Sequence, residues 1–210
     1  WRKRMIKLIA SDMDGTLLDS MGMWENLGTI YLKSRNITPP DDIKEIIEAK
    51  TLDEAAEYFI NELHLEGTVK QVVGEIVGII RDKYFNELGM KPGMKELVLS
   101  EYADGSKMCI LTTTARELAV AALKRNGILH CFTDVYTPEQ LKLSKRTPEI
   151  FLKTCEIMGF EPSETYVYED ALYAAKSAKA AGCKLVAVYD NMQRNDWSEI
   201  ESLADEIIKD

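Results

Sequence analysis

The sequence MIKLIASDMDGTLLD at residues 5–19 contains the clearest structural signal in the chain. Residues Met5 to Ala10 are mainly apolar, as expected of a buried parallel strand, and polar residues begin directly after them. Asp12 and Asp14 are two positions apart, so their side chains leave the same face of an extended chain. Open α/β sheets bind ligands at the carboxyl ends of their strands. The acidic pair therefore lies where a functional site is expected.

Similar apolar runs predict further strands, and helical patterns separate them. The predicted strands are Lys107–Leu111, Phe132–Tyr136, Thr165–Tyr168 and Lys184–Val188, and the predicted helices are Arg116–Asn126, Pro148–Met158 and Ala171–Ala181. Gly127, Gly159 and Gly182 each follow one of these helices, as expected of a C-terminal cap. The alternation predicts a doubly wound, Rossmann-like α/β fold, with a parallel sheet and helices on both faces.

Residues 20–88 interrupt this alternation, because they have helical periodicity and no convincing strand. Thr51-Leu52-Asp53-Glu54 is typical of a helix-starting capping box. A crossover between parallel strands needs far fewer residues than this segment contains. We therefore expect two domains: an α/β catalytic core of residues 1–19 and 89–210, and a small inserted α-helical cap domain of residues 20–88. The hinges between them would lie near Asp19 and near Gly89–Gly93.

Three later segments place polar groups after a predicted strand or in a loop. Thr112-Thr113-Thr114 follows one strand, Lys145 lies in a loop before a helix, and Glu169-Asp170 ends another strand. We also expect Thr114 to be the N-cap of the next helix. Carboxylates on two strands make a hard oxygen site suited to Mg²⁺. The hydroxyls and the ammonium supply donors for a phosphoryl group, so the set predicts phosphoryl transfer.

These segments, taken in order, resemble the four motifs of the haloacid dehalogenase superfamily of phosphotransferases. The matching stretches are Asp12–Ser20, Ile110–Thr113, Lys145–Phe151 and Glu169–Ala171. The likeness is to the branch with a helical cap inserted after the first motif. The resemblance implies a Mg²⁺-dependent phosphatase, a phosphoric monoester hydrolase acting on a small phosphorylated metabolite such as a sugar phosphate.

The resemblance also implies roles for the acidic residues. Asp12 would attack phosphorus and form an aspartyl-phosphate, while Asp14 would protonate the leaving group and then activate water. Mg²⁺ would be held by Asp12, the backbone carbonyl of Asp14 and Asp170, with Glu169 helping directly or through water.

The phosphoryl oxygens are expected to contact Thr112, Thr113 and Lys145. Arg146 occupies a position where the third motif usually has proline, and it adds a cation near the entrance of the site. A beta-phosphoglucomutase-like phosphohexomutase is the close alternative. Related mutases carry a basic residue, often arginine, on a cap loop, and the comparable loop here offers only Lys50. Lys50 is thus the expected substrate contact in the cap, and the phosphatase interpretation is favoured.

Two other classes of protein fit the sequence less well. A receiver-type signalling module also surrounds an aspartyl-phosphate with carboxylates, a threonine and a lysine. Its acidic pair comes first, whereas Glu169-Asp170 follows the lysine here. A catalytically silent interaction protein could share this fold, but all the reactive side chains are present.

Composition limits the partners and the setting. The net charge of −9 argues against binding to duplex nucleic acid, and no apolar stretch is long enough to span a membrane. The basic run Trp1–Arg4 is interpreted as a solvated extension. The four cysteines are widely spaced without a Cys-x-x-Cys pair, which is typical of a reduced, cytoplasmic protein without zinc or disulfides. The expected partner is a small phosphate ester; the oligomeric state stays open, and a monomer is consistent with the sequence.

Overall fold

The computed structural model describes residues 7–209, and the chain divides into two compact units. The first unit contains the chain up to Asp19 and from Leu88 onward, and the second is Ser20–Glu87. Leu88 thus belongs to the first unit, one residue away from the expected boundary. The basic run Trp1–Arg4 and the predicted start of the first strand at Met5 lie outside the described residues.

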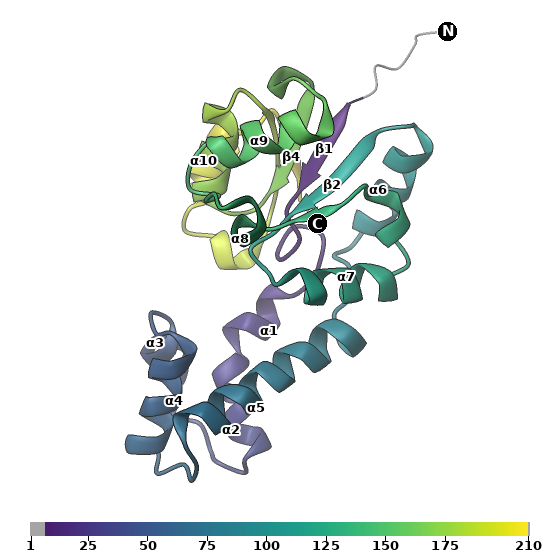
Figure 1. The fold of residues 1–210 in the computed structure, drawn as a ribbon. Helices are drawn as coiled ribbons and strands as arrows, with labels where there is room; N and C mark the ends of the chain where they lie inside the picture. Colours follow the sequence, from purple (N-terminus) through teal and green to yellow (C-terminus); the bar gives the residue numbers. More distant parts are fainter. Residues whose placement is uncertain (1–6, 210) are drawn as a thin grey trace, which may run out of the picture. The chain divides into compact units, whose positions relative to one another are not determined.

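The first unit contains a six-stranded, entirely parallel sheet (Figure 1). Its strands are β1 (Leu8–Ser11), β2 (Lys107–Leu111), β3 (Val135–Tyr136), β4 (Thr165–Glu169), β5 (Lys184–Val188) and β6 (Glu206–Ile208). The order is β3-β2-β1-β4-β5-β6, so β1 lies at the centre with chain order running outward on both sides. The predicted Rossmann-like α/β fold is confirmed. The point between β1 and β4 is a topological switch point, where such sheets bind ligands.

Helices α9 and α10 cover one face of this sheet. The helical segments of the first unit are α6 (Met94–Ala103), α7 (Arg116–Arg125), η2 (Leu129–Cys131), α8 (Pro138–Leu141), α9 (Glu149–Met158), η3 (Pro162–Glu164), α10 (Leu172–Ala180), η4 (Asn191–Gln193) and α11 (Trp197–Leu203). Leu8 and Ala10 of β1 pack with Phe151 of α9 and Ala174 of α10 in one buried cluster. Alternate residues of β1 thus face the same way, as a strand requires.

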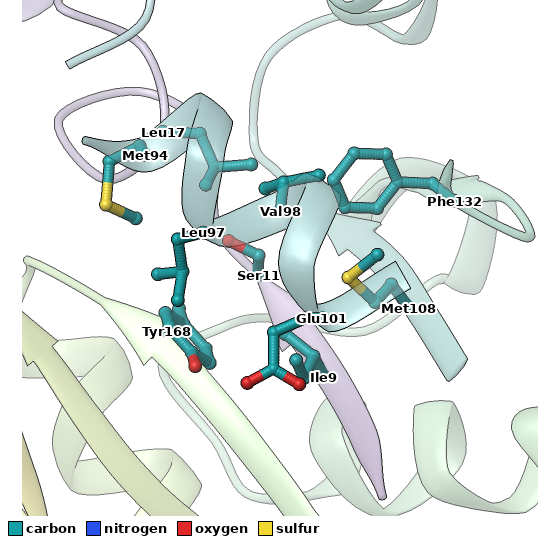
Figure 2. A pocket seen from close by; sticks show the side chains of 10 residues that line it. All are labelled: Ile9, Ser11, Leu17, Met94, Leu97, Val98, Glu101, Met108, Phe132 and Tyr168. Atoms are coloured by element: carbon teal, nitrogen blue, oxygen red, sulfur yellow. The ribbon is translucent and has the colours of Figure 1, made fainter. Parts of the chain in front are cut away.

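Helix α6 packs on the opposite face, where Ile9 and Ser11 of β1 point (Figure 2). Met94, Leu97 and Val98 of α6 line a small cavity there together with these strand residues. The cavity holds ≈ 10 Å³, about the room that one water molecule needs. It is therefore a packing gap and not a binding site for a metabolite.

The second unit consists of helical segments only, within the part of the chain that the structure describes. They are α1 (Met21–Glu25), α2 (Leu27–Ser34), α3 (Ile43–Ile47), α4 (Leu52–Asn61), α5 (Val69–Asp82) and the π-helical η1 (Lys83–Glu87). Capping boxes at Thr51 and Thr68 begin α4 and α5. Tyr31 stacks on Phe59 in the core of this unit, with ring centroids 5.8 Å apart.

The structure differs from the sequence-based prediction at the edges of the sheet. The predicted strand Phe132–Tyr136 is reduced to the two residues of β3. Strand β6 was not predicted, because Glu206 and Ile207 are exposed and show no apolar alternation. Among residues 7–209, no helix is both long and apolar enough to cross a membrane.

Candidate active site

The loop after β1 presents Asp12 and Asp14 at the centre of the sheet edge. Asp12 continues the strand pairing, since its backbone N–H donates to the Tyr168 carbonyl at 2.9 Å. Met13 between them is fully buried, so the two carboxylates leave the opposite side of the chain. The chain then turns sharply at Gly15, whose φ of 78° is a left-handed conformation that favours glycine.

Lys145 joins two of the carboxylates. Its ammonium donates to Asp12 Oδ1 and to Glu169 Oε2, both at 2.7 Å, and to the Leu111 carbonyl at 3.1 Å. Lys145 is 3% exposed, and these acceptors match the three hydrogens of its ammonium. The loop between α8 and α9 therefore delivers its lysine to the ends of β1, β2 and β4.

Three carboxylates converge beside this lysine. Oxygen atoms of Asp12, Glu169 and Asp170 lie within 4.8 Å of one another, and all three residues are buried. The Thr16 hydroxyl donates to Asp170 Oδ1 at 2.8 Å, and the Ala171 N–H donates to Glu169 Oε1 at 3.2 Å. These donors fix the orientation of both carboxylates of the second acidic pair.

The donor set fits a divalent cation such as Mg²⁺. The carboxylates are hard oxygen ligands, and three of them face a single ammonium, which leaves excess negative charge. The Asp14 carboxylate is not part of this cluster. Its predicted contribution is a backbone carbonyl, and that stays a prediction.

The electrostatics of the cluster reflect this excess of negative charge. The pKa of Asp12 is raised to about 7, mainly by burial, with Lys145 opposing the rise and the neighbouring Glu169 and Asp14 adding to it. Burial, with Glu169 and Asp12 nearby, also holds the pKa of Asp170 well above its usual range. Burial alone would lower the pKa of Lys145, but Asp12 and Glu169 more than compensate and raise it, so the ammonium keeps its charge.

The three threonines after β2 have different environments. Thr112 is buried, and its hydroxyl oxygen accepts from the Thr114 N–H at 3.1 Å, whereas Thr113 is exposed. The expected N-cap role of Thr114 is wrong: the N-cap of α7 is Ala115, whose side chain makes no capping hydrogen bond. The Thr114 hydroxyl donates instead to Asp14 Oδ2 at 2.6 Å. Sequence reasoning missed this contact, because a threonine before a helix is the usual signal of a cap.

The two remaining predicted cations lie in different units. The guanidinium of Arg146 lies over the Tyr173 ring, 4.4 Å from its centroid, in a cation–π contact next to Lys145 in the chain. Lys50 is exposed in the helical unit, between α3 and α4. Its contact with substrate stays a prediction.

Fold and site together define a doubly wound α/β protein with a lysine-bridged acidic cluster at the switch point of its sheet. The chain belongs to the haloacid dehalogenase-like hydrolase family, because the model of that family matches residues 9–188. This confirms the resemblance that the four motifs indicated.

Relatives and solved structures with different reported activities resemble this chain. A phosphorylated carbohydrates phosphatase from Thermotoga maritima is 23% identical over 194 residues, which are 86% of this chain and 84% of that protein. A bifunctional riboflavin kinase/FMN phosphatase from Arabidopsis thaliana is 23% identical over 89% of this chain, which spans only 49% of that relative's length. The structure of a candidate beta-phosphoglucomutase from Thermotoga maritima superposes with a TM-score of 0.84 at 20% identity, covering 97% of this chain and 94% of the other. At this identity the structural likeness shows the fold alone.

Proposed function

We propose that the protein is a Mg²⁺-dependent phosphatase that hydrolyses a small phosphorylated metabolite, such as a sugar phosphate or a similar phosphomonoester. The observation that carries the proposal is the buried Lys145, which bonds to both Asp12 and Glu169 beside Asp170 at the switch point. The family and its phosphatase members support the same reaction class. The helical unit is proposed to act as the cap, with Lys50 among its substrate contacts.

The reaction proceeds in two steps on the residues of this site. Asp12 attacks phosphorus, the bond from phosphorus to the ester oxygen breaks, and Asp14 gives its proton to the departing alkoxide. Water then attacks the aspartyl-phosphate as Asp14 takes its proton, which releases inorganic phosphate and restores Asp12. The Thr114 hydroxyl, bonded to Asp14 Oδ2, orients that acid through both steps.

Other groups of the site bind the charged phosphoryl oxygens. Lys145 supplies a buried positive charge, and Thr112 and Thr113 supply donors at the end of β2. Asp12, Asp170 and the Asp14 carbonyl would hold Mg²⁺, with Glu169 beside them. When bound, the ion supplies positive charge that reduces the repulsion between Asp12 and the phosphate dianion.

A beta-phosphoglucomutase-like phosphohexomutase is the second candidate. The superposition on a candidate beta-phosphoglucomutase favours it, but this likeness extends to the fold alone. A mutase must also hold a second phosphate, and the cap loop near Lys50 offers no arginine. Hydrolysis by water therefore ranks above transfer to a sugar hydroxyl.

The test is release of inorganic phosphate from a panel of phosphorylated sugars, nucleotides and small acids. We expect release with Mg²⁺ and none after chelation with EDTA, restored when Mg²⁺ is added in excess. Asp12→Asn should abolish turnover while the thermal midpoint stays close to that of the unchanged protein. Asp41→Asn, an exposed change in the helical unit, is the matched control and should keep full activity.

Three other results would contradict parts of this proposal. Turnover that persists in Asp12→Asn would rule out Asp12 as the nucleophile. Isomerisation of a hexose phosphate that needs a bisphosphate activator, with negligible phosphate release, would favour the mutase. Full activity in EDTA would contradict the metal requirement.

A further inference from the structure

A second buried lysine lies on the other side of the loop that carries the acidic pair. The ammonium of Lys91 donates to the Gly15 carbonyl at 3.0 Å, to the Tyr189 carbonyl at 2.6 Å and to Asp190 Oδ2 at 3.0 Å. Lys91 is 6% exposed, and these three acceptors match its three hydrogens. The proposed chemistry does not use this lysine.

The backbone of Lys91 contacts the same loop. Its N–H donates to the Leu17 carbonyl at 2.8 Å, and Leu18 forms an antiparallel bridge with Met90. The chain that leaves the α/β unit at Asp19 is thus paired with the chain that returns to it. Leu17 is also buried, and it lines the small cavity beside α6 together with Met94 and Val98 (Figure 2).

The partner of Lys91 is fixed as well. Asp190 accepts from Lys91 through Oδ2 and from the Met192 N–H at 2.9 Å through Oδ1. The ammonium therefore sits on a rigid support beyond the end of β5. Its third acceptor, the Gly15 carbonyl, belongs to the residue directly after Asp14.

This contact holds the carbonyl of Gly15, whose N–H is already bonded to the Leu18 carbonyl at 3.1 Å. Gly15 is needed because its φ is 78°, but a residue without Cβ has the largest conformational freedom of any residue. A charge-assisted hydrogen bond to its carbonyl restricts the orientation of that peptide. A buried lysine is costly to fold, so packing alone gives no reason for an ammonium at this position.

We propose that Lys91 is a positioning residue for the reaction: its ammonium, braced by Asp190 and the Tyr189 carbonyl, fixes the Gly15 peptide and thereby holds Asp14 in place. The inference rests on the proposed function only for the role of Asp14 in proton transfer. Whether Lys91 restrains the loop can be measured separately by hydrogen exchange, without an assay of activity.

The test compares Lys91→Met with the paired variant Lys91→Met/Asp190→Asn. The single variant leaves the buried Asp190 carboxylate without its cation, so we expect a lower thermal midpoint. The paired variant removes that charge and should recover most of the midpoint. In both variants kcat should fall about 10- to 100-fold with KM changed by less than about twofold, because the Gly15 carbonyl still lacks its donor. Lys95→Met, an exposed change at the second residue of α6, is the control and should match the unchanged protein.

Hydrogen exchange of residues 13–18 gives the second readout. The N–H groups of Gly15, Leu17 and Leu18 are all bonded within this turn, at 3.1, 2.9 and 2.8 Å, and should exchange faster in both Lys91 variants. Wild-type kcat in the paired variant, unchanged exchange in both, or an equal loss in Lys95→Met would each overturn the proposal. If the unchanged protein hydrolyses no phosphate ester, the proposed function fails, and the exchange experiment alone decides whether Lys91 holds the loop.

Discussion

At the scale of single residues, hydrogen-bond donors hold the carboxylates of the site, and the donors of Asp12 and Asp14 differ. Lys145 holds Asp12, with its Oδ1 at 2.7 Å, and Thr114 holds Asp14, with its Oδ2 at 2.6 Å. Glu169 shares Lys145. Side chains whose rotamers are fixed in this way are pre-organised, so little reorganisation is needed when a substrate binds. The two aspartates also differ in the charge of their donors. The ammonium of Lys145 contacts Asp12, whereas the neutral hydroxyl of Thr114 contacts Asp14.

Thr114→Val tests the hydroxyl that holds Asp14. Valine keeps the shape of the side chain and removes the donor, so Asp14 should sample other rotamers. We expect kcat for phosphate release to fall about tenfold or more, with a much smaller change in KM. Thr133→Val, an exposed β-branched replacement, serves as the control. An unchanged kcat in Thr114→Val would mean that this hydroxyl does not position the acid.

The sequence predicted which residues share this edge of the sheet better than it predicted their partners. Asp12, Lys145 and Asp170 were expected together, because strand ends and loops at one edge of a parallel sheet must meet there. The bond from Thr16 to Asp170 joins residues 154 positions apart, and no spacing rule reveals it. The Thr114 contact was hidden because it depends on a rotamer, which the order of residue types does not determine.

At the scale of elements, strand β1 places the site by its register. Ser11 pairs with Ile110 of β2 and with Tyr168 of β4, so the next residue, Asp12, lies level with Leu111 and Glu169. The central strands were predictable because they are buried on both faces and read as short apolar runs. The edge strands were not, because β3 has two residues and β6 depends on pairing with β5 rather than on its own pattern.

Thr68→Ala tests an element of the helical unit. The Thr68 hydroxyl oxygen accepts from the Gln71 N–H, and the Gln71 side chain accepts in return from the Thr68 N–H at 2.9 Å. Loss of this cap should lower the free energy of unfolding by about 1 kcal/mol, measured by urea unfolding followed by circular dichroism. Thr38→Ala, an exposed change in the same unit, should have a much smaller effect. Equal stabilities for the two variants would contradict a contribution from the capping box.

At the scale of the whole molecule, the free thiols are confined to one of the two units. Cys109, Cys131, Cys155 and Cys183 are all buried, and all lie in the α/β unit. A thiol reacts with a labelling reagent as the thiolate, and burial raises the pKa of both Cys109 and Cys131. Labelling therefore requires opening of the α/β unit, and its rate reports the free energy of that opening.

Labelling of these thiols tests the metal site without any assay of activity. The folded protein should react slowly, and all four thiols should react in denaturant. Under the proposed function Mg²⁺ would bind the folded acidic cluster and not the unfolded chain, so a concentration of 100 times its dissociation constant should stabilise the α/β unit by about 2.7 kcal/mol. Where opening and closing are faster than labelling, this stabilisation lowers the rate of thiol labelling about 100-fold. Asp170→Asn removes a proposed ligand and should lose most of this protection, whereas Asp134→Asn, in the same unit but outside the cluster, should keep it. Protection that is equal in Asp170→Asn and the unchanged protein would mean that Mg²⁺ binds elsewhere, and the acidic cluster would then need another explanation.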